Sequence, residues 1–351
     1  PVNLWSTDKQ RGGADELIPP LFGSFAKNTQ FSVELSQIIQ TANKRAKLVR
    51  REKVAKDMTI KDFEEVFRGL KIELKTTLHE TCYLQSYNKI LQKQSESLEQ
   101  LINTYRKQVK QGNIARSELL RLQSSLLETE NEVNETQQAL IEYRKTLKSL
   151  INANPLVMIE SEDNETNIIN PADIAISLLL EKGIEARPDM KRRQLTTQYH
   201  EKSLAYEKSL RIPDITFSAS YDRFGGVWKD FIGFGISFDI PFLNRNQGNI
   251  KSAKFLSEQS RYLEEQQQKL VQNEIIQAYD NYRQAYLFFI RINEDDLLPE
   301  LDDMLDVYTK NLLNKNINML EFIDFMDTYK SNKEIVLTSE KNVKNLVAEL
   351  H

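Results

Sequence analysis

Two long stretches of the chain repeat apolar residues at alternating spacings of three and four. Eight of ten such positions between residues 119 and 150 are apolar, as are seven of nine between 322 and 350. A third, less regular run extends from Ile60 to Val109. Sustained spacing of this kind is typical of helices that pack side by side over a great length, as in coiled coils. At ~1.5 Å per residue, a helix over about residues 45–110 would be roughly 100 Å long.

The pattern recurs when the chain is shifted on itself by 203 residues. Identical residues then pair in several places: Asn43 with Asn246, Tyr105 with Tyr308, Asn113 with Asn316, Ile114 with Ile317, and Glu118 with Glu321. Because 203 residues are 29 heptads, the apolar positions of both halves stay in phase. Polar segments at 110–114 and 314–317 interrupt the helical pattern in each half. We therefore predict two long helical hairpins of one design, with their tips at these segments.

Strand-like segments precede each hairpin. Residues 215–221 and 232–240 alternate apolar with small or polar residues, and 2–7 and 31–35 echo them. The 232–240 segment places large residues on one face, namely Ile232, Phe234, Ile236 and Phe238, and Gly, Ser and Asp on the other. One interpretation is a half-buried sheet on a soluble core. The other, favoured because so few strands accompany such long helices, is the lipid-facing and lumen-facing pattern of a membrane barrel. Since four strands cannot close a barrel, this interpretation predicts a cyclic oligomer.

These patterns divide the chain into six segments. They are a first strand pair at 1–40, a first long helical hairpin at 41–151, a looped connector at 152–187, a helix at 188–211, a second strand pair at 212–242 and a second hairpin at 243–351. Within the connector, we predict a short apolar helix from Ile174 to Leu180 that ends at Gly183.

Composition excludes several classes of function. Lys and Arg number 47 against 51 Asp and Glu, so no basic field indicates nucleic acid. The single cysteine, Cys82, rules out a disulfide framework, and with His79 it supplies too few ligands for a zinc site. No apolar run approaches the ~18–20 residues of a membrane-spanning helix. Since no nucleophile–base, phosphate-binding or dinucleotide motif is present, we predict no enzyme activity, no metal and no cofactor.

One continuous set of motifs resembles a known family. Arg187-Pro188-Asp189 opens a helix, Ile212-Pro213-Asp214 closes it, two alternating strands follow, and residues 241–250 read Pro-Phe-Leu-Asn-Arg-Asn-Gln-Gly-Asn-Ile. This order resembles the TolC-like outer-membrane efflux channels over essentially the whole chain. The last motif is most similar to the heavy-metal branch, the outer-membrane partners of cobalt–zinc–cadmium and copper–silver exporters.

The resemblance implies a fold and a location. The fold would be mainly α with a small β part, built from long antiparallel helical hairpins and four strands per chain. In a homotrimer the strands would form a 12-stranded β-barrel in the outer membrane of a Gram-negative bacterium, and the hairpins an α-helical tunnel across the periplasm. The family's segment before the first strand, with its helix and any lipid-anchored cysteine, would be absent from this chain.

The resemblance also implies sites. Glu321 and Asp324 lie three residues apart, hence on one helical face. They match by position the acidic constriction at the periplasmic entrance of such channels, and the alternative is an ordinary exposed acidic pair. The tips match the segments that meet a periplasmic adaptor protein: Gly112, Asn113, Ile114, Asn316 and Ile317. As turns, the same residues need no function beyond reversing the chain.

The implied function is a passive conduit of a tripartite efflux system, which docks an adaptor and an inner-membrane RND-type pump and exports metal ions or small molecules. The large strand residues would face outer-membrane lipid. A soluble coiled-coil scaffold or tether is the alternative from another class, and a secretion channel for peptides or proteins is the alternative within the family. The two unlike strand faces favour a channel, because a scaffold does not require them.

Overall fold

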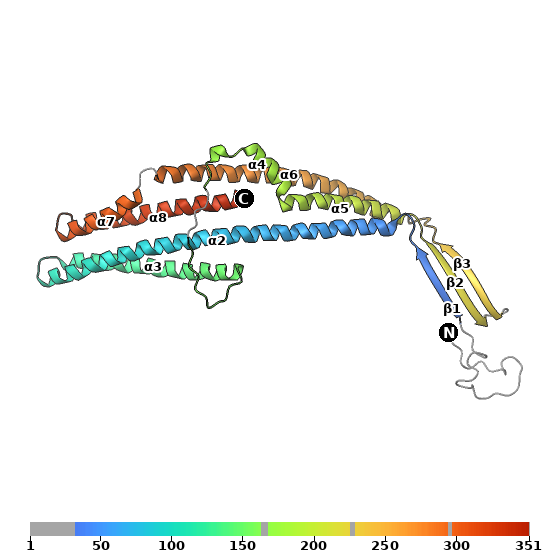
Figure 1. The fold of residues 1–351 in the computed structure, drawn as a ribbon, viewed down its shortest axis with the longest axis horizontal. Helices are drawn as coiled ribbons and strands as arrows, with labels where there is room; N and C mark the ends of the chain where they lie inside the picture. The colour runs from blue at the N-terminus through green and yellow to red at the C-terminus, as the bar shows by residue number, and fades with distance from the viewer. Residues whose placement is uncertain (1–31, 163–167, 225–228, 294–296, 351) are drawn as a thin grey trace, which may run out of the picture. The chain divides into compact units, whose positions relative to one another are not determined.

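The computed structural model describes residues 32–162, 168–224, 229–293 and 297–350, and it is mainly helical with a small sheet, as the sequence predicts (Figure 1). The elements in chain order are β1 (Ser32–Ile39), α2 (Lys44–Lys110), α3 (Arg116–Leu150), η2 (Pro171–Asp173), α4 (Ile176–Ala186), α5 (Pro188–Leu210), β2 (Ile215–Phe224), β3 (Lys229–Phe238), α6 (Gln247–Asn293), α7 (Leu297–Leu313) and α8 (Met319–Leu350). The chain divides into two compact units. The first holds the strands with the adjoining parts of α2, α5 and α6, and the second holds the hairpins and the connector.

The three strands form one antiparallel sheet in the order β1-β2-β3. Their register places Ser218 opposite Gly235 and Ser220 opposite Gly233. A Cβ atom at Gly235 would lie 2.6 Å from the Ser218 hydroxyl oxygen, and one at Gly233 would lie 2.8 Å from that of Ser220. The glycines of β3 thus leave room for the hydroxyls of β2 on one face of the sheet. The predicted strand at 2–7 lies outside the described residues.

The helix boundaries in the structure recur at the same 203-residue offset as the sequence repeat. The long helices α2 and α6 begin at Lys44 and Gln247, 203 residues apart, and each follows an asparagine with a positive φ, 54° at Asn43 and 58° at Asn246. The outgoing helices end, and the returning helices begin, at positions with the same offset: 110 and 313, then 116 and 319. The outgoing helices differ in continuity: α2 is unbroken, whereas α6 ends at 293 and α7 begins at 297.

The motifs at the strand–helix junctions hold the first unit together. The Asp214 carboxylate accepts hydrogen bonds from the Thr41 amide at 2.9 Å and from Lys44 Nζ at 2.6 Å. The Asn246 side-chain amide donates to the Glu207 carboxylate at 2.7 Å and to the Glu207 carbonyl at 3.0 Å. The conspicuous Pro-Phe-Leu-Asn-Arg-Asn-Gln-Gly-Asn-Ile segment therefore starts α6 and fastens it to α5.

The apolar core of the second unit lies where both hairpins approach their tips. It combines residues from α2 and α3 with residues from α7 and α8: Leu98, Leu101, Ile102, Tyr105, Leu122, Leu301, Leu305, Leu312, Met319, Phe322, Phe325, Met326 and Tyr329. The Tyr308 and Phe325 rings stack with their centroids 4.0 Å apart. The 3–4 spacing seen in the sequence is therefore the seam along which the hairpins pack.

The connector helix differs from its prediction. Helix α4 begins at Ile176 and continues to Ala186, past the predicted end at Gly183. A Cβ atom at Gly183 would clash with the Cδ1 atom of Ile275 on α6. The glycine therefore permits close helix packing rather than ending the helix. Among the described helices, none is long and apolar enough to cross a membrane.

Candidate functional site

The first hairpin tip is a glycine-capped helix end. The Gly112 amide donates to the Val109 carbonyl at 3.1 Å, and the Asn113 amide donates to the Gln108 carbonyl at 3.0 Å. These two bonds satisfy carbonyls that the end of α2 would leave free. Gly112 has a φ of 77°, in the left-handed region, and open space surrounds its Cα. The turn therefore needs glycine for its backbone conformation and not for lack of room.

The second tip repeats this geometry without glycine. The Lys315 amide donates to the Leu312 carbonyl at 3.1 Å, and the Asn316 amide donates to the Asn311 carbonyl at 2.9 Å. Lys315 stands 203 residues after Gly112 and has a φ of 61°. A side chain in this conformation is strained relative to glycine. The second tip therefore keeps the turn at a cost that the first one avoids.

The five predicted tip residues do not all point outward. Gly112, Asn113 and Asn316 are exposed, whereas Ile114 and Ile317 are half-buried against the apolar core. The two isoleucines therefore hold the turns on the hairpins. What a partner could touch at the tips is the polar backbone and the asparagine side chains.

The predicted acidic pair lies on the exposed face at the start of α8. Glu321 and Asp324 are both exposed, as is Asp327 one turn further on. Glu321 also caps the helix, because its Oε2 accepts a hydrogen bond from the Asn318 amide at 3.2 Å while its own amide donates to Asn318 Oδ1 at 2.9 Å. This reciprocal pair is a capping box. Sequence reasoning missed this second role, although the spacing of Asn318 and Glu321 carries the signal.

Another carboxylate, that of Asp302 on α7, joins the two hairpins through ion pairs. It lies 2.7 Å from Lys333 Nζ and 3.2 Å from Lys93 Nζ, and it accepts a hydrogen bond from the Tyr329 hydroxyl at 2.8 Å. Partial burial alone would raise the pKa of this carboxyl, but the Lys333 and Tyr329 hydrogen bonds lower that pKa below its ordinary value. Burial raises the pKa of the Tyr329 hydroxyl, and the hydrogen bond to Asp302 and the Asp302 charge raise it further. This acidic residue is therefore part of the hairpin packing.

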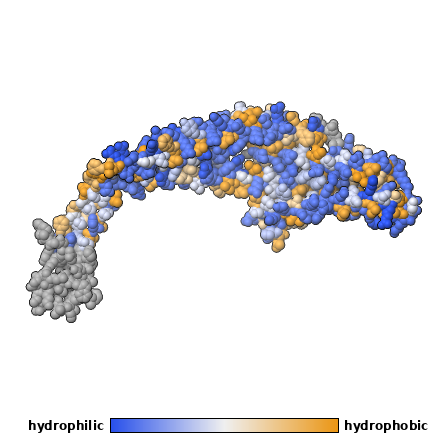
Figure 2. Space-filling view, turned by 180° about the vertical axis from the view of Figure 1, so that it is seen from behind, coloured by the Kyte–Doolittle hydropathy of each residue, from blue (hydrophilic) through white to orange (hydrophobic). Residues whose placement is uncertain are grey.

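The predicted lipid-facing residues lie together on the apolar face of the sheet. Phe234 is 86% exposed and Ile236 is 67% exposed, and Ile232 and Phe238 share their face and are also exposed. Residues of the neighbouring strands extend this face: Val33, Leu35, Ile39 and Phe217. Figure 2 shows hydrophobic residues gathered over the strands, with hydrophilic residues prevailing over the helices. The sheet is thus a single layer with one bare apolar side.

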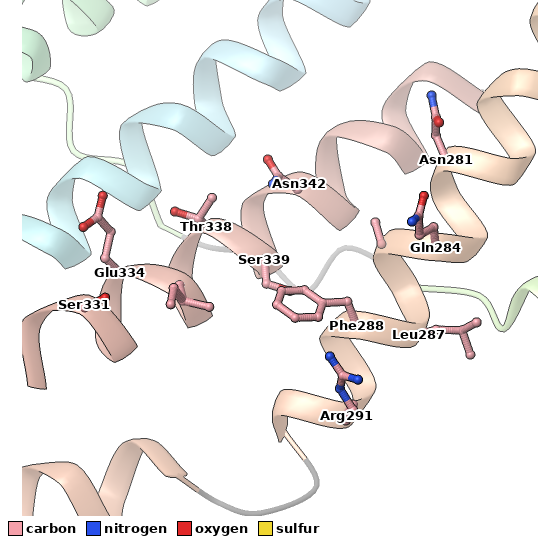
Figure 3. A pocket seen from close by; sticks show the side chains of 12 residues that line it. Asn281, Gln284, Leu287, Phe288, Arg291, Ser331, Glu334, Thr338, Ser339 and Asn342 are labelled. Carbon is pink, nitrogen blue, oxygen red and sulfur yellow. The ribbon is translucent and has the colours of Figure 1, made fainter. Parts of the chain in front are cut away.

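An open groove of about 980 Å³ lies between α6 and α8 in the second unit (Figure 3). Helix α6 contributes Phe288 and Arg291, whose guanidinium carbon lies 5.5 Å from the Phe288 ring centre. Helix α8 contributes Glu334, Thr338 and Ser339. The lining also includes Ser331 and Asn342, and Glu334 is the single carboxylate among its described residues.

The sequence singled out His79 and Cys82 as a possible ligand pair. The His79 Nδ1 atom lies 2.8 Å from Asn345 Oδ1 on α8, so the imidazole joins the helices. Across the described residues, no group of three or more His, Cys, Asp or Glu side chains has the placement to hold a metal ion.

This chain is similar to known proteins in its fold, although its sequence matches none of the families or curated proteins that were compared with it. The Campylobacter jejuni outer membrane channel CmeC aligns with a TM-score of 0.76 at 14% identity, over 92% of this chain and 70% of that one. The Vibrio cholerae outer membrane protein VceC aligns with a TM-score of 0.72 at 13% identity, over 92% and 78% of the two chains.

A third solved structure captures a defined state of such a channel. The open state of the Neisseria gonorrhoeae outer membrane channel MtrE aligns with a TM-score of 0.72 at 12% identity, over 92% of this chain and 74% of that one. These similarities do not select the heavy-metal branch. The chain has the fold of the TolC-like outer-membrane channels that its motifs resemble.

Proposed function

We propose that three copies of this chain form the outer-membrane conduit of a tripartite export system. The observation that carries the proposal is the bare apolar face of the sheet, on which Phe234 is 86% and Leu35 is 73% exposed. Antiparallel sheets of soluble proteins pack such a face against a core. Lipid against this face, and water against the serine and glycine face, would suit both sides of the sheet.

Closure of the conduit would require other copies of the chain. Three described strands are far below the roughly eight that a closed sheet needs. Rotation of one chain onto the next, with the sheet of one continuing in the sheet of its neighbour, produces a ring. The hairpins of each copy would then line a tunnel that continues from the ring.

The exposed tips would meet the partners. Gly112, Asn113 and Asn316 offer polar backbone and side-chain groups to a periplasmic adaptor, while Ile114 and Ile317 keep the turns in place. An inner-membrane pump would deliver cargo through that adaptor. The conduit itself would act passively, as a route and not as an enzyme.

The acidic face of α8 would narrow the tunnel entrance. In a threefold assembly, Glu321 and Asp324 bring together six carboxylates from three copies. A ring of carboxylates attracts cations and sets the selectivity of a pore. Asp327 would extend the same negative surface by one helical turn.

The cargo of the proposed conduit is metal ions or small molecules. The 241–250 segment that resembles the heavy-metal branch starts α6 and binds Glu207 through Asn246. That structural role serves any cargo equally, and a peptide or protein cargo is the alternative within the same fold.

Conductance across a planar lipid bilayer tests the proposal. We expect the purified chain to insert as a trimer and to conduct, with divalent cations blocking the current from the side of the helical tips. The double variant Glu321→Gln/Asp324→Asn should lose this block, because amides keep the size but lose the charge. The matched control Glu181→Gln/Glu185→Gln, two exposed residues of α4, should keep it. Equal block in both variants would place Glu321 and Asp324 outside the pore.

Charged substitutions on the two faces of the sheet test whether the protein is a membrane channel or a soluble scaffold. Phe234→Arg or Phe238→Arg should impair insertion, at a cost of about 2–4 kcal/mol per site at mid-bilayer depth. Ser237→Arg, on the opposite face, should be tolerated. A chain that stays monomeric and soluble without detergent, and that never conducts, would favour the scaffold.

A further inference from the structure

We propose that the strand–helix junction of the first unit binds the phosphate groups of anionic phospholipids. This inference rests on the proposed function, since it places the junction at a membrane surface. The junction is where β1 runs into α2, α5 runs into β2, and β3 runs into α6. All three helical segments bring exposed cations to the same end of the sheet.

The start of α2 is the most basic part of the chain. Residues 44–56 carry seven Lys and Arg against one Glu, although the whole chain has a net charge of −4. Lys44 is buried and paired with Asp214, and Arg51 pairs with Glu52. Arg45 and Arg50 are exposed, and no ion pair of the described residues includes them. Their positive charge is therefore available to an external anion.

The start of α6 contributes a crevice with the same character. A crevice of about 490 Å³ is lined by Arg211 just after α5, by Arg245 just before α6, and by Lys251 and Lys254 on α6. Lys254 has only a distant partner, Glu258 at 3.7 Å. No described carboxylate forms an ion pair with the other three cations. Two carboxylates lie close to these residues: the exposed Asp239 directly follows β3, and Glu207 of α5 accepts a hydrogen bond from the Asn246 side chain at 2.7 Å.

Arg45 lies in the first turn of α2, and Arg245 lies just before the first turn of α6. Neither α2 nor α6 has an acidic residue in its first turn. The positive end of the helix dipole disfavours nearby cations and favours anions. A phosphate near a helix start would be favoured by the helix dipole and by the neighbouring cations. Asp214 and Glu207 each bring one carboxylate close to a helix start, and the surrounding cations outnumber them, so an external anion would balance the remaining positive charge.

The neighbouring apolar residues identify the anion as a lipid headgroup. Ile240, Phe242 and Leu243 follow β3 and are 59%, 77% and 93% exposed. These exposed apolar residues extend along the chain from the apolar face of the sheet to Arg245, the first cation of the crevice after β3. A headgroup layer is about 5–8 Å thick on each side of a bilayer, or roughly three to five residues along a helix. Long Arg and Lys side chains further along the helix can reach back into this layer.

Lipid binding to the full 351-residue chain in detergent tests the inference. The apparent Kd is measured with fluorescent phosphatidylglycerol and with fluorescent phosphatidylcholine. We expect phosphatidylglycerol to bind about a hundredfold more tightly, since each basic residue near an anionic surface contributes to the attraction. The variant Arg245→Gln/Lys251→Gln/Lys254→Gln should reduce this preference to less than tenfold. Inorganic phosphate at millimolar concentration should not displace the lipid.

Two further variants make the test specific. The control Lys107→Gln/Lys110→Gln/Arg116→Gln removes the same charges from an exposed hairpin tip and should keep the full preference. The exchange Arg245→Lys/Lys251→Arg/Lys254→Arg keeps the charge at the junction and should keep the preference as well. Equal loss in the tip control would overturn the inference, as would displacement of the lipid by inorganic phosphate, which would identify a small-anion site.

Conductance separates this inference from the proposed function. In a bilayer of phosphatidylcholine alone, the junction variant should still conduct, because the tunnel does not need the anionic lipid. A wild-type chain that conducts but shows no preference for phosphatidylglycerol would overturn the lipid site and leave the conduit intact. A wild-type chain that never conducts would overturn the conduit itself.

Discussion

Helices α3 and α8 hold equivalent places in the repeat, but α8 contributes far more of its residues to the core than α3 does. α3 buries five of its 35 residues, whereas α8 buries twelve of its 32. The reason is position: α8 contacts α2 through Asn345 and α7 through Lys333, and its Lys330 lies 2.7 Å from Glu132 of α3. The two repeats thus share their helix boundaries, while α8 lies at the centre of the packing and α3 at its edge.

Truncation of equivalent core residues should give the largest difference between the hairpins. Phe322 of α8 is fully buried, and its counterpart Leu119 of α3 is half-buried. We expect Phe322→Ala to lower the free energy of unfolding by about 3–5 kcal/mol, and Leu119→Ala to lower it by about 1–2 kcal/mol. Denaturant titration of both variants measures this. Equal losses would show that both helices carry the core alike.

Asp302 should give the next largest effect, and one that depends on pH. Asp302→Asn weakens the hydrogen bonds from Lys333 and Tyr329, so we expect a loss of about 1.5–3 kcal/mol at pH 7. Because the folded state lowers the pKa of this carboxyl, its contribution is present above about pH 4 and is lost as the pH falls further. The difference between wild type and variant should therefore shrink at pH 3. Glu99 of α2 is the counterpart of Asp302 in the first repeat and is exposed. Glu99→Gln should therefore change the free energy of unfolding by less than about 0.5 kcal/mol at either pH.

The helix caps differ between the hairpins in a way that can be exchanged. Asn318 caps α8, whereas Ala115 stands at the equivalent place before α3 and makes no side-chain cap. Asn318→Ala should cost about 1 kcal/mol of unfolding free energy, and Ala115→Asn should add about 1 kcal/mol. Thermal unfolding followed by circular dichroism measures both. Two changes of the same sign would contradict the capping account.

The turns should give the smallest effect, with opposite signs at the two tips. Lys315→Gly relieves a side chain held at a positive φ and should add about 0.5–1 kcal/mol of stability. Gly112→Ala places a side chain in the same conformation and should cost about 1 kcal/mol. Both residues lie in open or exposed positions, so contacts do not obscure the comparison. The same unfolding measurement applies.

The hairpins and the three described strands were predictable because their signals are local. Heptad spacing marks a helix seam residue by residue, and alternation marks the two faces of β3. The Asp302 contacts were not predictable, because Lys93 lies 209 residues and Lys333 31 residues from Asp302 in the chain. The prediction that α4 ends at Gly183 was wrong for the same reason, because Gly183 packs closely against Ile275, which is distant in the sequence. The Asn318–Glu321 cap had a local signal that the acidic-pair interpretation of Glu321 concealed.

The common 203-residue offset has a consequence for how such a chain can change length. One residue inserted into α2 would turn everything beyond it by about 100° and move Leu98, Leu101 and Tyr105 away from the core that both hairpins share. Seven residues would turn it by roughly 700°, close to two full turns, and would leave the seam nearly in register. Viable insertions and deletions in the hairpins should therefore come in heptads. They should also occur in both repeats together, since a lengthened α2 without a lengthened α6 and α7 would leave one tip standing beyond the other.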